Sequence, residues 1–166
     1  MLLISLILAV LMISTPSSAI NLANLKGDWN IAGVFDNKNN LKWDQVSCPT
    51  ANIDESDNIV IMNAKVYDGA DKEWVSQEFK WEVVTTDPLV LKNAHTELTS
   101  PMYQFGVLKL DDKTLALYQS NRSFGFLLSK ESDVSETNKA EFAKIFASEN
   151  SFPNKGENLF FFGFTC

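Results

Sequence analysis

Short segments that alternate between apolar and polar residues run through most of the chain, and turn signals separate them. Alternation with a period of two is typical of strands that bury one face. Eight such segments follow one another, at residues 29–35, 45–53, 58–67, 72–84, 89–92, 102–110, 114–120 and 123–129. The Asp-Gly pair at 68–69 and the Asp-Pro pair at 87–88 indicate tight turns. The pattern predicts an all-β fold, in which these antiparallel strands form a meander and close into an up-and-down barrel.

A single α-helix is predicted after the eighth strand, where the period changes. Phe142, Ile145 and Phe146 are spaced i, i+3 and i+4, so they share one face of a helix. Ser135 is a suitable N-cap, and Glu136 lies in the first turn. We expect a helix of about three turns whose apolar stripe packs on the outside of the barrel. A final strand is predicted at 159–164.

The first nineteen residues have the pattern of a signal peptide. Residues 2–13 are almost wholly apolar, and residues 15–19 supply the small side chains of a cleavage site after Ala19. A membrane anchor is the alternative, but the apolar run is short for a span of about 20 residues. Cleavage leaves residues 20–166 as one domain of ordinary size, secreted to the extracellular space, with no membrane span.

Charge and cysteine content narrow the function classes. The formal net charge of −7 argues against nucleic acid or an anionic membrane surface as a partner. The two cysteines are Cys48 and Cys166, and an even number in a secreted chain favours a disulfide. Two free thiols and an intermolecular bridge remain the alternatives.

Several motifs occur in a recognisable order. Gly27 and Trp29 open the first predicted strand and are followed by Ala32; Asp111 lies in the turn between the sixth and seventh; residues 126–130 close the eighth. In this order they resemble the three motifs of the lipocalin family, and most closely those of the apolipoprotein D and insect bilin-binding branch. The helix after the eighth strand and an early cysteine paired with a C-terminal one also fit that branch. The resemblance therefore implies the pair Cys48–Cys166.

The chain departs from the family pattern at two places. Leu110 and Asp112, which flank the second motif's Asp, do not match the usual Thr and Tyr. Lys130 stands where the third motif usually ends in Arg, which covers the tryptophan at the base of the barrel. The resemblance implies that Gly27, Trp29 and Lys130 have structural roles, with Lys130 offering less stacking area and no planar fork.

The resemblance also implies a cavity for a small hydrophobic ligand, and the chain has twelve Phe, four Trp and three Tyr to line it. The candidate ligand-binding residues are Phe35, Trp43 (as a lid from the long first loop), Met62, Phe79, Trp81, Leu91, Tyr103, Phe105, Tyr118, Phe124 and Phe126. Any of them can instead be an ordinary core residue. The third and sixth strands are apolar on both faces, so Met102, Leu108 and Leu110 can replace Tyr103 and Phe105 in the inward set.

Two polar residues are further candidates. His95, the one histidine, falls in a loop that the resemblance places at the barrel mouth, where it either meets a ligand head group or faces solvent. Asn121, in the sequence Asn-Arg-Ser, is a predicted N-glycosylation site. No nucleophile–base pair, phosphate loop or metal-ligand spacing stands out, so we predict neither an enzyme nor a metal site. Lipocalin enzymes include a prostaglandin synthase with a barrel Cys, but both cysteines here are assigned to the disulfide.

Taken together, these patterns predict a secreted lipocalin that binds and transports a small hydrophobic ligand inside its barrel. The ligand classes that stay open are a pigment such as a bilin or carotenoid, a fatty acid, a retinoid, a sterol and a semiochemical. No cofactor is required, and a bound chromophore or lipid would be the cargo. The alternatives are a barrel with a side-chain-filled core that binds other proteins or forms a homo-oligomer and, after it, an isomerase or epoxidase-like enzyme on the same fold.

Overall fold

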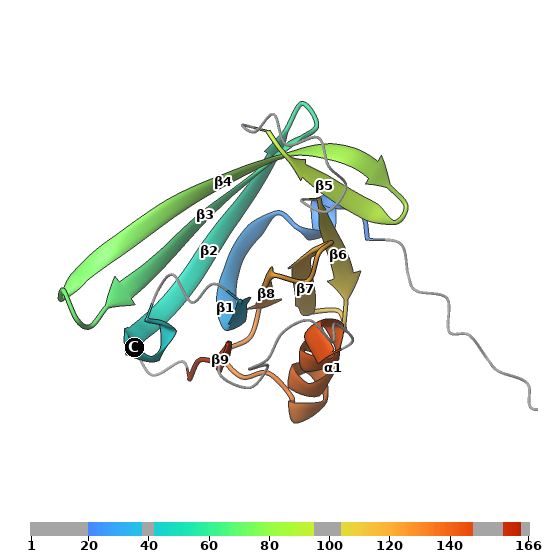
Figure 1. The fold of residues 1–166 in the computed structure, drawn as a ribbon. Coiled ribbons are helices and arrows are strands. Elements are labelled where there is room, and N and C mark those ends of the chain that lie inside the picture. Colours follow the sequence, from blue (N-terminus) through green and yellow to red (C-terminus); the bar gives the residue numbers. More distant parts are fainter. Residues whose placement is uncertain (1–19, 38–41, 95–103, 148–157, 164–166) are drawn as a thin grey trace, which may run out of the picture.

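The strands follow one another around a closed barrel (Figure 1). The structure, a computed structural model, describes residues 20–37, 42–94, 104–147 and 158–163. Its elements are the 3-10 turns η1 (Leu22–Asn24) and η2 (Trp43–Gln45), the strands β1 (Gly27–Asp36), β2 (Val46–Ser56), β3 (Ile59–Asp68), β4 (Glu73–Thr86), β5 (Leu89–Asn93), β6 (Phe105–Lys109), β7 (Thr114–Gln119), β8 (Phe124–Ser129) and β9 (Leu159–Phe161), and the helix α1 (Glu136–Ala147).

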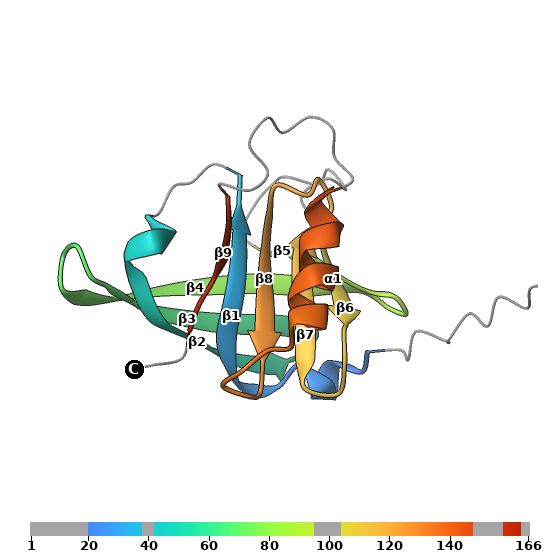
Figure 2. The ribbon, with the colours of Figure 1, turned by 90° about the horizontal axis from the view of Figure 1, so that it is seen from below.

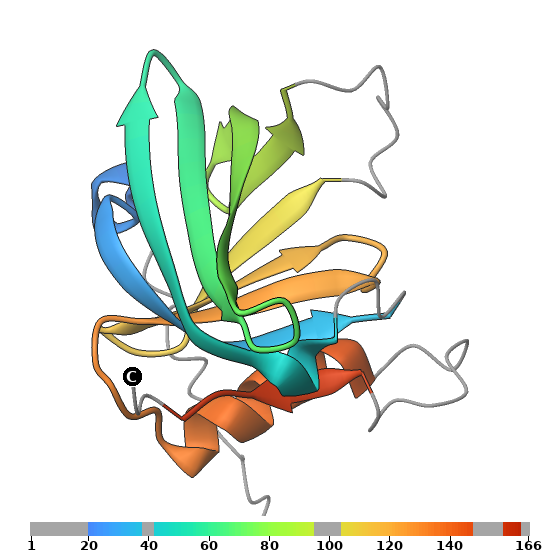
Figure 3. The ribbon, with the colours of Figure 1, turned by 90° about the vertical axis from the view of Figure 1, so that its left-hand side faces the viewer.

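Every pairing in the sheet is antiparallel, and the sheet order runs from β2 through β8 to β1 and then β9. The additional pairing of β1 with β2 closes the barrel, as Figure 3 shows from the side. Strand β9 lies beside the second half of β1. The predicted eight-stranded antiparallel barrel with one helix outside is therefore confirmed.

Strand β1 contains a bulge that changes which of its side chains point inward. Ile31 pairs with Leu128 and Gly33 with Leu127, so Ala32 is an extra residue in the ladder. Before the bulge Trp29 and Ile31 face the interior core; after it Val34 does, while Phe35 packs outside. One inserted residue exchanges the two faces of a strand because side chains alternate with a period of two.

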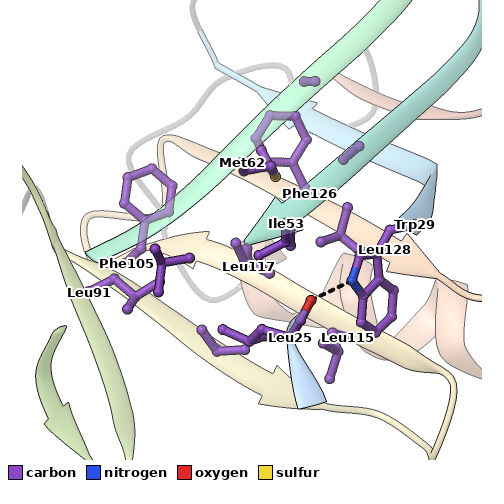
Figure 4. Close-up of a cluster of buried hydrophobic side chains, with 14 of the residues drawn as sticks. Leu25, Trp29, Ile53, Met62, Leu91, Phe105, Leu115, Leu117, Phe126 and Leu128 are labelled. Carbon is purple, nitrogen blue, oxygen red and sulfur yellow. Dashed lines mark hydrogen bonds between the residues drawn. The ribbon is translucent and has the colours of Figure 1, made fainter. Parts of the chain in front are cut away.

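The interior core fills the end of the barrel that holds Trp29 (Figure 4). The Trp29 side chain is 4% exposed, and its Nε1 donates a hydrogen bond to the Leu25 carbonyl at 2.6 Å. Lys130 covers the ring, with its Nζ 4.0 Å from the ring centroid and 2.9 Å from the Asp28 carbonyl. Partial burial lowers the pKa of Lys130, although the negative charge of Asp28 acts in the opposite direction.

Gly27 is the first residue of β1, two positions before Trp29, and its backbone conformation requires a glycine. Its φ of +111° lies in a region that side chains rarely adopt. A Cβ at this position would also stand 3.2 Å from the Lys130 Nζ. The three structural residues that the resemblance implied, Gly27, Trp29 and Lys130, thus meet at one end of the barrel.

The helix packs on the outer face of the sheet near β7 and β8 (Figure 2). The Ser135 Oγ accepts a hydrogen bond from the Asn138 backbone N–H at 3.2 Å, which confirms the predicted N-cap. Phe142 and Phe146 are buried, and Ile145 is half-buried at the edge of the contact. Gly125 allows the close approach, because a Cβ there would stand 2.5 Å from the Phe146 ring.

A polar contact fastens the helix to the β6–β7 turn. The Asn138 side chain is 7% exposed, and its amide donates a hydrogen bond to the Asp111 Oδ2 at 2.5 Å. The other Asp111 oxygen accepts from the Lys113 backbone N–H at 2.8 Å. Desolvation alone would raise the pKa of Asp111, but the hydrogen bonds from Lys113, Asn138 and Thr114 outweigh it and lower the pKa.

We expect Asp111→Ala to lower the free energy of unfolding by about 1–3 kcal/mol, because it leaves the buried Asn138 amide without an acceptor. Since the folded state lowers the pKa of Asp111, its contribution should be complete above the usual carboxyl range, about pH 4, and should disappear as the pH falls through the lowered value. Urea unfolding across the acid range measures both effects.

Asp112→Ala is the matched control for that prediction. Its side chain is 91% exposed and forms an ion pair with Lys109, so its removal should change stability little. Equal losses in the two variants would contradict the role assigned to the Asp111–Asn138 contact.

Candidate functional site

A cavity of about 600 Å³ lies inside the barrel at the end away from Trp29. Its walls come from β1, β3, β4, β6 and β8, and its rim lies where β5, β7 and the β7–β8 turn reach the loops. The residues that line it are Ile31, Asp36, Trp43, Ala64, Val66, Val75, Gln77, Phe79, Trp81, Asn93, Phe105, Gln119, Asn121, Ser123, Phe124 and Phe126. Its volume is within the range of about 300–1,000 Å³ that small-molecule sites occupy.

Five aromatic side chains from β4, β6 and β8 form a continuous aromatic wall of the cavity, and this wall crosses the barrel interior because β4 and β8 lie on opposite sides of the barrel. Phe79 stacks on Trp81 with ring centroids 5.7 Å apart, and Trp81 lies 5.3 Å from Phe105. Phe126 makes edge-to-face contacts with Phe79 at 5.6 Å and with Phe124 at 4.8 Å. Such contacts fix the rings against one another, so the wall is a preformed apolar surface.

The rim of the cavity is polar. The Ser123 hydroxyl lies 2.6 Å from the Gln119 Oε1 and 2.7 Å from the Asn121 Oδ1, and the Ser123 backbone N–H donates to that same Asn121 oxygen at 3.0 Å. Gln77 and Asn93 add two further carboxamides to the lining. Amides and hydroxyls both donate and accept, so this rim can meet the polar end of an otherwise apolar molecule.

Trp43 and Asp36 join the first loop to the cavity wall. Asp36 ends β1 and is 4% exposed, while Trp43 begins η2 and is 6% exposed. The Trp43 Nε1 donates a hydrogen bond to the Asp36 Oδ2 at 3.1 Å. The tryptophan predicted as a lid therefore lies against the cavity and is oriented by a buried carboxylate.

Most of the aromatic residues predicted to line a cavity do so. Trp43, Phe79, Trp81, Phe105, Phe124 and Phe126 are all in its lining. Met62 and Leu91 point inward but are fully buried in the interior core and do not line the cavity (Figure 4). Of the two alternatives given for these residues, lining or core, the structure shows the core position, because neighbouring side chains fill the barrel at their level.

Two predicted lining residues lie on the outside of the barrel. Phe35 stacks on Phe146 of the helix at 4.2 Å, because the bulge at Ala32 turns it outward. Tyr118 packs against the helix-side cluster and under Arg122, whose guanidinium carbon lies 4.2 Å from its ring centroid. The prediction that these two side chains point into the barrel is wrong.

The inward phase of the third and sixth strands is now clear. Phe105 and Val107 of β6 belong to the interior core, and they pair with Gln119 and Leu117 of β7. Leu108 and Leu110 pack on the outer, helix-side cluster, so they do not replace Phe105. On β3 the inward set is Val60, Met62, Ala64 and Val66.

Several predictions concern residues outside those that the structure describes. They are the signal peptide at 1–19, His95, Tyr103, the alternative Met102, and Cys166. Asn121 lies in the turn between β7 and β8 and lines the rim; its glycosylation remains a prediction.

The Cys48–Cys166 disulfide also remains a prediction as a pairing, although Cys48, in β2, is not a free cysteine. Peptide mapping of the secreted protein without reduction is expected to recover the Cys48 peptide linked to the Cys166 peptide. Recovery of both peptides as free thiols, or of a bond between two chains, would contradict it.

The sequence interpretation missed most of the polar lining. Gln77 interrupts the apolar phase of β4, and Gln119 shares the phase of Leu117 on β7, so strand periodicity could have identified both. Asp36 had no such signal, because its inward direction depends on the bulge in β1. Among the described residues, no group of three or more His, Cys, Asp or Glu side chains could hold a metal ion, and no helix is long and apolar enough to cross a membrane.

The sequence matches no protein-family model, and no curated protein is significantly similar to it. Solved structures do share its fold. A siderocalin, Ex-FABP, described as having dual ligand specificities, aligns with a TM-score of 0.60 and 15% identity over 86% of this chain and 96% of its own. Lobster apocrustacyanin A1 aligns with a TM-score of 0.57 and 11% identity over 88% of this chain and 81% of its own.

A third similar structure is the cockroach allergen Per a 4, with a TM-score of 0.54 and 12% identity over 88% of this chain and 89% of its own. The three proteins are lipocalins. The expected lipocalin fold is therefore confirmed, while identities this low do not distinguish one branch of lipocalins from another.

Proposed function

We propose that this protein is a secreted carrier that binds one small hydrophobic molecule inside its barrel. The observation that supports the proposal best is the cavity of about 600 Å³, with its aromatic wall and the polar rim at its opening. Burial of an apolar ligand there would contribute about 25 cal/mol for each Å² removed from water. The rim would orient the ligand by its polar end.

The proposal also covers export of the protein, its branch within the lipocalins and the class of its cargo. The apolar segment at 2–13 and the small residues that end at Ala19 support export and removal of residues 1–19. Membership of the apolipoprotein D and bilin-binding branch, with a pigment as cargo, is proposed from the order of the sequence motifs. We assign the chain a binding role and no catalytic residue.

Native mass spectrometry of the protein purified from a secreting host tests the proposal. We expect a mass increment of one small molecule for each chain, which is lost on denaturation. We also expect a start at Ile20 and binding of a fluorescent hydrophobic probe with one-to-one stoichiometry. A barrel that carries no ligand and binds no probe would contradict the carrier role.

One observation favours the second candidate, a barrel that binds another protein or a second copy of itself. Trp74 of β4 is 52% exposed on the outer face of the barrel, where its ring contacts Tyr67, and this exposure is high for a large apolar side chain. The same mass spectra separate the two candidates, because this alternative predicts ligand-free protein in complexes of higher mass.

A further inference from the structure

The inner end of the cavity is closed by packed side chains. On several strands an inward residue lines the cavity, while the inward residue two positions further into the barrel belongs to the interior core and does not line it. These pairs of lining and core residues are Phe126 and Leu128 on β8, Ala64 and Met62 on β3, and Phe105 and Val107 on β6. The cavity is therefore a well that ends at the interior core.

Three aromatic rings form the floor of this well. Trp81, Phe105 and Phe126 line the cavity but are only 1%, 7% and 2% exposed, which places them at its inner end. The Trp81 and Phe105 rings lie 5.3 Å apart, and Phe79 contacts both Trp81 and Phe126. Leu91, which is fully buried, pairs with Phe105 in the adjacent strand (Figure 4). A ligand could pass this floor only by displacing core side chains.

The other end of the well is open to water. Val75 and Gln77 of β4 line the cavity and are also exposed, Val75 by 36%. From Trp81 to Val75 the strand covers about 20 Å, and its tilt in the barrel reduces this to about 15 Å along the barrel axis. An apolar chain longer than this depth would extend into water, where further methylene groups gain nothing from burial.

We propose that the cavity selects its ligands by length, because the floor of Trp81, Phe105 and Phe126 limits the apolar part of a ligand to about 15 Å. The polar end of the ligand would stay at the rim, among the carboxamides and the Ser123 hydroxyl. The proposal rests on the carrier function proposed above and narrows its ligand class. It favours retinoids, compact bilins and chains of medium length, and it disfavours carotenoids and long-chain fatty acids.

Competition with a series of 1-alkanols tests the limit, because the members share one polar group and differ only in length. Hexanol, octanol, decanol, dodecanol, tetradecanol and hexadecanol would each compete with the neutral probe N-phenylnaphthylamine for the intact mature protein. We expect the affinity to rise about fourfold for each methylene group that enters the well. The rise should stop near dodecanol, whose extended chain is about as long as the well is deep, so hexadecanol should bind no more tightly than tetradecanol.

Phe126→Ala tests whether the floor sets this limit. Removal of a buried ring leaves an apolar space at the inner end of the well, which a longer chain can fill. The alcohol at which the rise stops should therefore be longer by at least about two carbons. Phe124→Ala is the matched control, because it removes the same ring from the same strand, but Phe124 is half-buried and lies nearer the opening. It should weaken the binding of the alcohols without changing the length at which the rise stops.

Ala64→Leu tests the limit in the opposite direction. Ala64 is the last lining residue of β3 before the buried Met62, so a larger side chain there would occupy the inner end of the well. The rise should then stop at a shorter alcohol. Circular dichroism checks that each variant folds, and Ala64→Leu decides the question if Phe126→Ala does not fold.

The outcomes separate this proposal from the carrier function. If the affinity of the unmodified protein rises at every step to hexadecanol, the length limit is wrong while the carrier function stands. The same holds for the role of the floor if a folded Phe126→Ala or Ala64→Leu variant keeps the original limit. If the protein binds neither the probe nor any of the alcohols, the carrier function itself is wrong.

Discussion

Trp29→Ala should lower the free energy of unfolding by about 3–5 kcal/mol, the range measured for large aromatic deletions in protein cores. Trp29 is 4% exposed and fills the closed end of the barrel, where the packed side chains of the interior core limit how far the structure can collapse into the space left behind. The substitution also removes the donor to the Leu25 carbonyl, which is then buried without its partner.

The loss should lower the melting temperature by on the order of 10 °C for a domain of this size. Thermal and urea unfolding of the mature protein, followed by circular dichroism, measure it. Trp74→Ala is the matched control, because Trp74 is 52% exposed on β4 and contributes an edge contact with Tyr67 and a cation–π contact with Lys65. We expect the control to lose no more than about 1 kcal/mol. Similar losses in both variants would show that Trp29 does not close the barrel.

The order and approximate boundaries of the strands and the helix could be predicted from the sequence because they depend on local signals. The Asp-Gly pair at 68–69 ends β3, and the segment from residue 123 differs from the observed β8 by one residue at its start. Likewise Ser135 caps the helix, and Phe142 and Phe146 form its buried stripe, as their spacing indicates. In each case the deciding interaction lies within a few residues along the chain.

The inward side of each strand was harder to predict, since it depends on contacts between distant segments. The bulge at Ala32 arises in the pairing of β1 with β8. Gly33 beside it is the one local signal, because a glycine inside a strand often marks a bulge, but it does not determine which residue is inserted. The bulge moves Phe35 out to the helix and brings Asp36 into the cavity, and the apolar residues in both phases of the strand do not reveal this exchange.

Tyr118 shows a second reason for error. The helix covers the outer face of β7, so Ala116 and Tyr118 pack on one side while Leu115 and Leu117 pack on the other. A strand that is covered on both faces loses the alternation of apolar and polar residues from which its inward side could be inferred. Gln77 was missed for a different reason: its position in the apolar phase of β4 marks it as inward, but a search for apolar lining residues leaves a polar side chain out.

Phe126→Asp should weaken binding of a hydrophobic ligand by about a hundredfold or more, if the cavity is the binding site. Phe126 is 2% exposed and stands between Phe79 and Phe124 in the aromatic wall. An aspartate there would place a second carboxylate in the cavity that holds Asp36, with no cation in the described lining to pair with it. An unpaired charge in an apolar site costs several kcal/mol, and each 1.4 kcal/mol corresponds to about tenfold in affinity.

Titration of a neutral hydrophobic probe, followed by quenching of tryptophan emission, measures this loss. Phe126→Ala shows whether the fold survives the loss of the ring, and circular dichroism of both variants checks it. Phe161→Asp is the matched control, because Phe161 is 39% exposed on β9 and packs toward the helix at Phe142, outside the cavity. It introduces the same charge by the same substitution and should leave the affinity unchanged. If a folded Phe126→Asp variant binds as tightly as the unmodified protein, the ligand binds elsewhere. The alternative function, a barrel that binds other proteins or a second copy of itself, then explains this structure better.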